Sequence, residues 1–246
     1  MGDTILEVQE NDPKEAARER AREIAAGYAE RGDAVGWFDE LYREAAGDID
    51  RIPWADLEPN KFLVRWAEKY GLEGIGRRAM VVGCGLGDDA RFLYERGFDV
   101  TAFDISRTAI EWARDIHRDT GIRFAAADLL YPPKEWYQAF DFVLEVYTIQ
   151  PLPIEMRPSV IDAVANLVAL GGELLVVTRG REDDEVPDEL PWALSRRDLS
   201  RFADNGLVEQ EFDIMMGDEE EPIPRFVVKY QRPGIEPFSA VMVNEI

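Results

Sequence analysis

The chain has 246 residues, of which 46% are hydrophobic and 11% aromatic, so it suits one globular domain with a small appendage and is not disordered. Its formal net charge of -22 at pH 7 argues against nucleic acid and anionic membranes as partners, because both would repel it. A single cysteine excludes an internal disulfide framework, no apolar run approaches the ~20 residues that span a bilayer, and no secretory signal is visible, so we expect a cytoplasmic protein.

Helix-forming sequence comes first along the chain. Residues 13–29 are rich in alanine, glutamate and arginine, and Pro13 suits the first turn of a helix. Further helices are predicted over 36–46 and 60–70, with a proline-containing loop between them. The predicted division of the chain is an N-terminal helical segment, a main domain and a C-terminal tail, at residues 1–60, 61–232 and 233–246.

From residue 78 onward, apolar strands alternate with helices, which predicts a parallel sheet. Strands are expected at 78–83, 99–104, 122–127, 140–146 and 173–178. Helices are expected at 88–96, 106–119, 155–170 and 196–205, with a short one at 133–138. Two last strands, 207–215 and 225–231, follow one another closely and favour an antiparallel hairpin. The predicted fold class is α/β, a doubly wound, mostly parallel sheet of seven strands with a C-terminal antiparallel β-hairpin, preceded by N-terminal helices. It resembles the Rossmann-like fold of class I methyltransferases.

A glycine-rich loop follows the first predicted strand. It contains Gly83, Gly85 and Gly87, and the next strand ends on Asp104. Glycines let the backbone approach a ligand closely, and a carboxylate at a strand tip can hold two ribose hydroxyls. The layout indicates a nucleoside-cofactor site, to which we also assign Ile105.

The start of the following helix distinguishes between two cofactors. A dinucleotide loop has the spacing Gly-x-Gly-x-x-Gly and a helix N-terminus that faces the pyrophosphate. Here the sixth position is Asp88, and Asp89 follows it. Two carboxylates suit the helix dipole but would repel a pyrophosphate. S-adenosyl-L-methionine has no phosphate and carries a cationic amino group and sulfonium, so the sequence favours it over NAD.

Asp128 closes the third predicted strand. An aspartate in this place can simply start a turn. In class I methyltransferases, however, an acid here typically accepts a hydrogen bond from the adenine amino group. The resemblance therefore assigns Asp128 to the adenine and places Leu129 against the adenine face.

Three further segments resemble the thiopurine methyltransferase family and its thiol and halide methyltransferase relatives. They are Ile-Pro-Trp-Ala-Asp-Leu at 52–57, the fourth strand with the following helix start at 140–157, and Leu-Pro-Trp-Ala-Leu-Ser at 190–195. The resemblance implies methyl transfer to a small molecule, first of all one with a sulfur, selenium or halide acceptor. The family often has Asp-Arg after the fourth strand, where this chain has Glu145 and Val146, so recognition of the acceptor by that arginine does not carry over.

Candidate catalytic residues lie at the end of the fourth strand, where the transferred methyl is expected. If the strand continues, Glu145 and Tyr147 point to the same face. Glu145 would hold the sulfonium or the amino group of the cofactor or accept a proton, and Tyr147 would shape the acceptor pocket. The residues expected around the acceptor are Trp37, Trp54, Pro191 and Trp192. For Trp37, a place in the core and a place in an N-terminal lid over the cofactor are both open.

The remaining reactive side chains have simpler interpretations. His117 lies late in a charged helix and is expected at the surface, and Cys84 is expected to pack inside the glycine loop. No residues have metal-ligand spacing, so no metal is expected. Two alternatives stay open, a regulatory protein that binds the cofactor without transferring a group and, more weakly, an NAD-dependent oxidoreductase. The acceptor and the oligomeric state also stay open.

Overall fold

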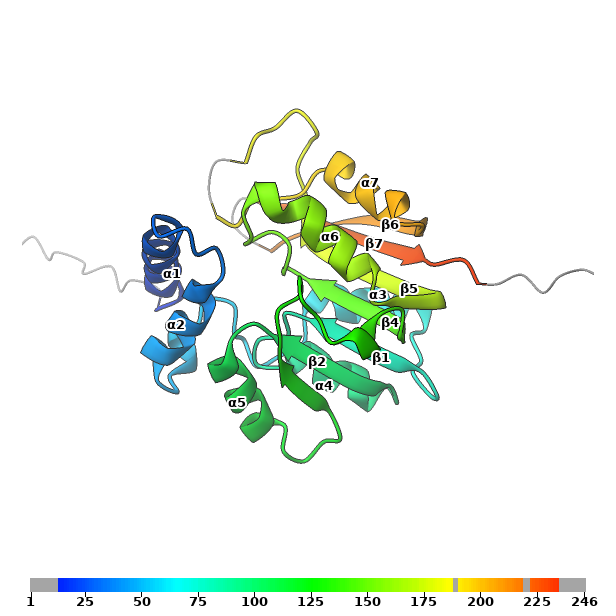
Figure 1. Ribbon diagram of the computed structural model, residues 1–246, viewed down its shortest axis with the longest axis horizontal. Coiled ribbons are helices and arrows are strands. Elements are labelled where there is room, and N and C mark those ends of the chain that lie inside the picture. The colour runs from blue at the N-terminus through cyan, green and yellow to red at the C-terminus, as the bar shows by residue number, and fades with distance from the viewer. Residues whose placement is uncertain (1–12, 188–189, 219–221, 235–246) are drawn as a thin grey trace, which may run out of the picture.

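Seven strands form one sheet in the order β3-β2-β1-β4-β5-β7-β6 (Figure 1). The computed structural model describes residues 13–187, 190–218 and 222–234. The strands are β1 (Arg78–Val82), β2 (Asp99–Asp104), β3 (Arg123–Ala126), β4 (Phe140–Val146), β5 (Val168–Arg179), β6 (Val208–Met216) and β7 (Pro224–Gln231). Strands β1 to β5 pair in parallel, whereas β7 is antiparallel to both β5 and β6. The predicted fold class, including the C-terminal hairpin, is confirmed.

The strand order reverses between β1 and β4, which pair with each other through registers such as Val82 with Glu145. In open α/β sheets, ligands bind at such a reversal, beyond the carboxyl ends of the strands. The topology therefore directs attention to the ends of β1, β2 and β4.

Helices cover both faces of the sheet. They are α1 (Pro13–Ala29), α2 (Gly36–Ala45), α3 (Lys61–Tyr70), α4 (Asp88–Glu95), α5 (Arg107–Ile116), α6 (Arg157–Ala165) and α7 (Arg196–Asp204), with 3-10 turns η1 (Ile49–Arg51), η2 (Lys134–Trp136) and η3 (Ile154–Met156). One hydrophobic cluster joins α3, α4 and α5 to the sheet, and a second joins α6 and α7 to its other face. Within β4, Phe142 and Leu144 belong to the first cluster and Val143 to the second, as expected for a strand that is buried on both sides.

The helix predicted over 155–170 ends earlier than expected, at Ala165. The chain then enters β5 at Val168, which pairs with Phe140 of β4. Gly171, at φ 77°, allows the irregular pairing at the start of this long strand. Pairing with β4 therefore overrides the helical pattern that the sequence suggests after residue 165.

The N-terminal helices form a small cluster of their own around Leu41, Tyr42 and Ile52. Figure 1 shows α1 and α2 beside the edge of the sheet at which the parallel strands finish. The side chain of Asn60 caps α3 by accepting hydrogen bonds from the backbone amides of Phe62 and Leu63. The predicted helical segment thus leads directly into the main sheet, although residues 1–12 and 235–246 of the predicted segments lie outside the described residues.

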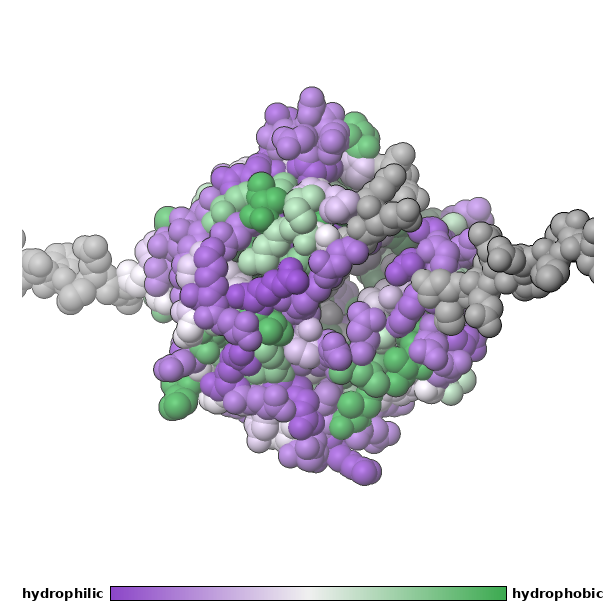
Figure 2. Space-filling model, turned by 180° about the vertical axis from the view of Figure 1, so that it is seen from behind, coloured by the Kyte–Doolittle hydropathy of each residue, from purple (hydrophilic) through white to green (hydrophobic). Residues whose placement is uncertain are grey.

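Hydrophilic residues dominate the surface seen from behind, and hydrophobic side chains form only small separate groups there (Figure 2). This distribution matches the net charge of -22. In the described part of the chain, no helix has the length and hydrophobicity needed to cross a membrane.

Candidate active site

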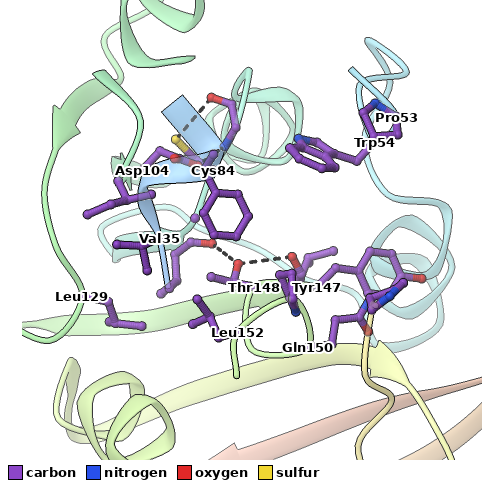
Figure 3. A pocket seen from close by; sticks show the side chains of 18 of the residues that line it. Val35, Pro53, Trp54, Cys84, Asp104, Leu129, Tyr147, Thr148, Gln150 and Leu152 are labelled. Atoms are coloured by element: carbon purple, nitrogen blue, oxygen red, sulfur yellow. Dashed lines mark hydrogen bonds between the residues drawn. The ribbon is translucent and has the colours of Figure 1, made fainter. Parts of the chain in front are cut away.

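A cavity of about 580 Å³ lies beyond the carboxyl ends of β1, β2 and β4. Figure 3 shows Asp104 and Leu129 at one end of it and Trp54, Tyr147 and Gln150 at the other. We call these the glycine end, which also includes Gly83, Gly85 and Asp128, and the aromatic end, which also includes Pro191. The walls come from α1, α2, the loop before α3, the ends of the central strands and the segments near residues 150 and 190.

The glycine loop is closely packed. Gly83 has φ 58°, and a Cβ there would lie 2.5 Å from Thr148 Oγ1. Gly87 has φ 91° and precedes α4, and its Cβ would lie 2.7 Å from the Phe124 ring. Both positions therefore need glycine for conformation and for space. Gly83 and Gly85 line the cavity, whereas Gly87 is not among its lining residues and shapes the turn into the helix.

Asp104 lies at the floor of the glycine end and is only 8% exposed. Its Oδ2 accepts a hydrogen bond from Gly85 N at 2.9 Å, and its Oδ1 accepts one from Ser106 N at 2.9 Å. Burial raises the pKa of Asp104, and these backbone donors act in the opposite direction. A carboxylate has about four acceptor positions, so two further hydroxyl donors can bind there. Ile105 follows it and also lines the cavity.

Two aspartates occupy the first turn of α4 and line the cavity beside the glycine loop. Asp89 Oδ1 accepts a hydrogen bond from Asn60 N at 2.7 Å, which ties the loop before α3 to this helix. Burial raises the pKa of Asp88 and of Asp89 to about 6, and for Asp88 the charge of Asp56 adds to the effect. The end of the cavity next to α4 is therefore acidic, which suits a cation and opposes a pyrophosphate.

His117 is buried, with 4% of its surface exposed, so the expectation of a surface residue is wrong. Its ring stacks on Phe124, and Nε2 lies 2.9 Å from the carbonyl oxygen of Leu86. The end of α5 carries this side chain beneath the glycine loop, where desolvation lowers its pKa. A charged helix sequence could not reveal this position, because the contact joins residues 31 apart.

Asp128 and Leu129 line the cavity together with Phe103. Asp128 Oδ1 accepts a hydrogen bond from Leu130 N at 2.8 Å, which is a turn-forming contact. The same side chain borders the cavity, so the turn and the assignment to adenine are compatible. Cys84 Sγ lies 3.8 Å from the Gly85 carbonyl oxygen, and burial raises the thiol pKa well above its usual value, which agrees with a packing role.

The fourth strand does not continue past Val146. Tyr147 has φ 57°, in the left-handed region, so Glu145 and Tyr147 do not follow the alternation of a strand. Tyr147 lines the aromatic end, and its hydroxyl accepts a hydrogen bond from Arg225 Nε at 2.9 Å. Glu145 is fully buried and is not among the residues that line the cavity.

Aromatic side chains from the N-terminal segment form one wall. Trp54 Nε1 donates a hydrogen bond to the Tyr42 hydroxyl at 2.8 Å. Trp37 stacks on Phe38 with ring centroids 3.9 Å apart and meets the edge of Trp54 at 6.0 Å. Because Trp37 is 3% exposed and also borders the cavity, it belongs to both the core and the wall.

Of the two residues predicted near position 190, Pro191 lines the cavity and Trp192 does not. The backbone of Trp192 instead donates to the Gln150 carbonyl oxygen at 2.9 Å. Sequence analysis did not single out Thr148, Gln150 and Arg225, which also line the cavity. They come from an irregular turn and from a strand far along the chain, and no local pattern marks them.

The glycine end fits the adenosine and the cationic groups of S-adenosyl-L-methionine. The carboxylate of Asp104 can accept hydrogen bonds, Gly83 and Gly85 have no side chain between the backbone and a ligand, and Leu129 supplies an apolar surface. No lysine or arginine belongs to the glycine loop itself. In the part of the chain that the structure describes, no group of three or more His, Cys, Asp or Glu residues is arranged to hold a metal ion.

Comparison with known proteins gives the same result. Residues 79–172 match the family described as "Methyltransferase domain". This part of the chain is similar to class I S-adenosylmethionine-dependent methyltransferase domains. The predictions of such a methyltransferase and of S-adenosyl-L-methionine as its cofactor are thereby confirmed for this domain.

Similar proteins include the probable S-adenosyl-L-methionine-dependent methyltransferase TehB of Haemophilus influenzae (strain 10810), 26% identical over 132 residues. That match covers 54% of this chain and 44% of TehB, so the chain spans less than half the length of the curated relatives it matches. The structure of the N-methyltransferase NodS of Bradyrhizobium japonicum WM9, solved with S-adenosylhomocysteine, is also similar, with a TM-score of 0.60 and 19% sequence identity. The match covers 79% of this chain and 97% of the NodS chain.

A third similar structure comes from work on the conversion of a disulfide bond into a thioacetal group during echinomycin biosynthesis. The match has a TM-score of 0.64 at 25% sequence identity and covers 81% of this chain and 93% of the other chain. The fold shared with the methyltransferase NodS thus extends well beyond the matched residues 79–172.

Proposed function

We propose that this protein transfers the methyl group of S-adenosyl-L-methionine to a small molecule that binds at the aromatic end of the cavity. The observation that carries the proposal is that one cavity is lined both by the glycine loop with Asp88 and Asp104 and by aromatic side chains such as Tyr147. When bound, the cofactor supplies a methyl group already activated by a positive sulfur. The protein then has to align the acceptor and keep water out.

At the glycine end, Asp104 would accept hydrogen bonds from the ribose hydroxyls and Asp128 one from the adenine amino group. Gly83, Gly85 and Ile105 would contact the cofactor through the loop and the tip of β2, and Leu129 would pack against the adenine. Gly87 would act indirectly, by setting the turn into α4.

At the aromatic end, Trp54 and Tyr147 would contact a flat, apolar acceptor, with Trp37 behind them. Pro191 closes the cavity nearby, and Trp192 would support it through its backbone bond to Gln150. Helices α1 and α2 would form a lid, because Arg22 and Tyr42 from these helices border the same cavity.

We further propose a thiol or another soft nucleophile as the acceptor. The described lining residues include no histidine or lysine, and the carboxyl groups of Asp88 and Asp89 lie beside the glycine loop, where the cofactor is expected. An easily ionised thiol suits such a site because it needs little help to lose its proton. The segments that resemble thiopurine methyltransferases support this choice. So does the sulfur chemistry named for the similar structure that is 25% identical.

Methyl-labelled S-adenosyl-L-methionine incubated with thiophenol, phenol and benzylamine tests the proposal. We expect labelled methyl phenyl sulfide and one S-adenosylhomocysteine per product, with slower transfer by Asp104→Ala at a cofactor concentration that does not saturate the wild type. Methylation of phenol or benzylamine but not of thiophenol would overturn the acceptor class. Failure to bind S-adenosylhomocysteine would overturn the function itself.

A further inference from the structure

Glu145 is a fully buried carboxylate that lies outside the cavity lining. Its Oε1 accepts two backbone hydrogen bonds, from Thr148 N at 2.7 Å and from Ile149 N at 3.0 Å. Its Oε2 has no hydrogen-bond partner among the described residues. The carboxyl group therefore holds the turn that follows β4 instead of facing the cavity.

That turn has an unfavourable backbone conformation and needs such support. Tyr147 has φ 57°, a value that a bulky side chain rarely adopts. A residue in this region persists only where its surroundings hold it. The two hydrogen bonds to Glu145 begin at the next residue, Thr148, and so fix the backbone immediately after Tyr147.

The same turn reaches the glycine loop. Thr148 Oγ1 donates a hydrogen bond to the carbonyl oxygen of Val82 at 2.9 Å, the last residue of β1 (Figure 3). The Thr148 side chain also fills the space in which a Cβ of Gly83 would lie. A chain of contacts thus runs from Glu145 through Thr148 to the loop at the glycine end.

The segment held in this way, residues 147–152, supplies a large part of the aromatic end. Its members Tyr147, Thr148, Gln150, Pro151 and Leu152 all line the cavity. We propose that Glu145 is a positioning residue, which acts through the Thr148 turn to fix the aromatic end relative to the glycine loop. The proposal rests on the proposed methyl transfer for its effect on catalysis, but not for its effect on the turn.

This role differs from that of a general base. A base must reach the acceptor, whereas Glu145 is fully buried and does not line the cavity. Burial raises the pKa of Glu145 to about 7, and the amides of Ile149 and Thr148 act against that shift by favouring the charged form. In the proposed role, one side-chain oxygen at position 145 accepts hydrogen bonds from two backbone N–H groups. The uncharged side-chain oxygen of a glutamine can do the same.

Two variants separate these roles. Glu145→Gln keeps an oxygen that can accept from Thr148 N and Ile149 N, whereas Glu145→Ala leaves both amides without an acceptor. Hydrogen exchange of the ligand-free protein, followed by mass spectrometry, reports on residues 147–152. We expect roughly 10-fold faster exchange there in Glu145→Ala, less than about 3-fold in Glu145→Gln, and no change in β6, which pairs only with β7. Unchanged exchange at 147–152 in Glu145→Ala would overturn the proposal.

Binding and turnover complete the test. With S-adenosylhomocysteine, Glu145→Ala should bind roughly 10-fold more weakly and Glu145→Gln should bind like the wild type. With thiophenol, Glu145→Gln should keep kcat and its pH profile within about 3-fold, whereas a general base would make Glu145→Gln as inactive as Glu145→Ala. That second result would overturn the proposal.

A further variant, Thr148→Val, keeps the shape of the side chain but removes its hydrogen bond to Val82. It should weaken S-adenosylhomocysteine binding in the same direction, and unchanged binding would contradict the link to the glycine loop. It keeps the test available if Glu145→Ala does not fold. If no acceptor is methylated, the exchange and binding results still decide the role of Glu145, so failure of the proposed function is recognised separately.

Discussion

At the glycine end of the cavity, the contacts come from consecutive strand ends, and backbone groups make many of them. Gly83 and Gly85 follow β1, Asp104 ends β2, and Asp104 accepts directly from Gly85 N. At the aromatic end, side chains meet from segments far apart in the chain, as when Arg225 donates to Tyr147 across 78 residues. The comparison indicates that the first end depends mainly on strand ends and backbone groups and the second on side chains from distant segments, with the Thr148 turn in contact with both. Substitution of Asp104 should therefore act mainly on cofactor affinity and substitution of Tyr147 mainly on acceptor recognition.

The largest effect is expected from Gly83→Ala. A Cβ there would lie 2.5 Å from Thr148 Oγ1 at a φ of 58°, so conformation and crowding both oppose it. We expect a loss of about 2–5 kcal/mol in the free energy of unfolding, measured with urea, and loss of S-adenosylhomocysteine binding.

The matched control is Gly47→Ala, because Gly47 also has a positive φ, of 93°, but a Cβ there would meet nothing within 4 Å. It should lose only the conformational part, about 1–2 kcal/mol. Equal losses for the two variants would show that the contact between the glycine loop and Thr148 is unimportant.

Asp104→Ala should reduce affinity for S-adenosylhomocysteine by about 1.5–3 kcal/mol, because it removes hydrogen bonds to a charged group. Titration calorimetry measures this loss. Asp99→Ala is the control on the same strand, since Asp99 is the first residue of β2 and pairs at the surface with Arg123 at 2.7 Å. If Asp104→Ala binds S-adenosylhomocysteine as tightly as the wild type, or if both variants lose the same affinity, Asp104 does not belong to the cofactor site.

The acidic start of α4 predicts a dependence of stability on pH. Burial raises the pKa of Asp88 from 3.8 to about 6, so between these values the folded protein binds more protons than the unfolded chain. The free energy of unfolding of the ligand-free protein should therefore fall as pH rises from about 4 to 6. The share of Asp88 is about 1–3 kcal/mol, which Asp88→Asn should remove.

Asp119→Asn is the control for this measurement. Asp119 is exposed, and its hydrogen bond to Arg91 lowers its pKa, so its contribution to stability is lost only below about pH 4. Thermal unfolding between pH 4 and 7 should show a flatter profile for Asp88→Asn and an unchanged one for Asp119→Asn. A wild-type stability that rises with pH over this range would contradict the electrostatic account of the glycine end.

The smallest effect is expected from Tyr147→Phe, which removes the acceptor of the hydrogen bond from Arg225. The KM for thiophenol should rise about 3–10-fold, while S-adenosylhomocysteine affinity stays within about 2-fold of the wild type. Tyr137→Phe alters an exposed tyrosine outside the cavity lining and should change neither quantity. A large loss of cofactor affinity in Tyr147→Phe would mean that the two ends are not separate.

Much of the fold was predictable because it follows from local patterns. The alternation of strands and helices, the hairpin and the glycine loop each occupy short stretches with strong signals. The residues predicted at the glycine end line one cavity, apart from Gly87. The early end of α6 was missed because pairing of Val168 with Phe140 is a tertiary contact.

The aromatic end was less predictable for the same physical reason. Glu145 and Tyr147 were expected on one face, but the left-handed backbone at Tyr147 breaks the alternation. The burial of His117 under Leu86 joins residues that no local pattern connects. The hydrogen bond that Ser106 Oγ donates to Asp39 Oδ1, at 2.8 Å, does the same. Side-chain contacts between distant segments depend on the complete fold.

Titration calorimetry with S-adenosylhomocysteine and, separately, with NAD tests the central claim most directly. The account predicts one binding site per chain for S-adenosylhomocysteine, competition by S-adenosyl-L-methionine, and no heat with NAD. Binding of NAD without any binding of S-adenosylhomocysteine would contradict it.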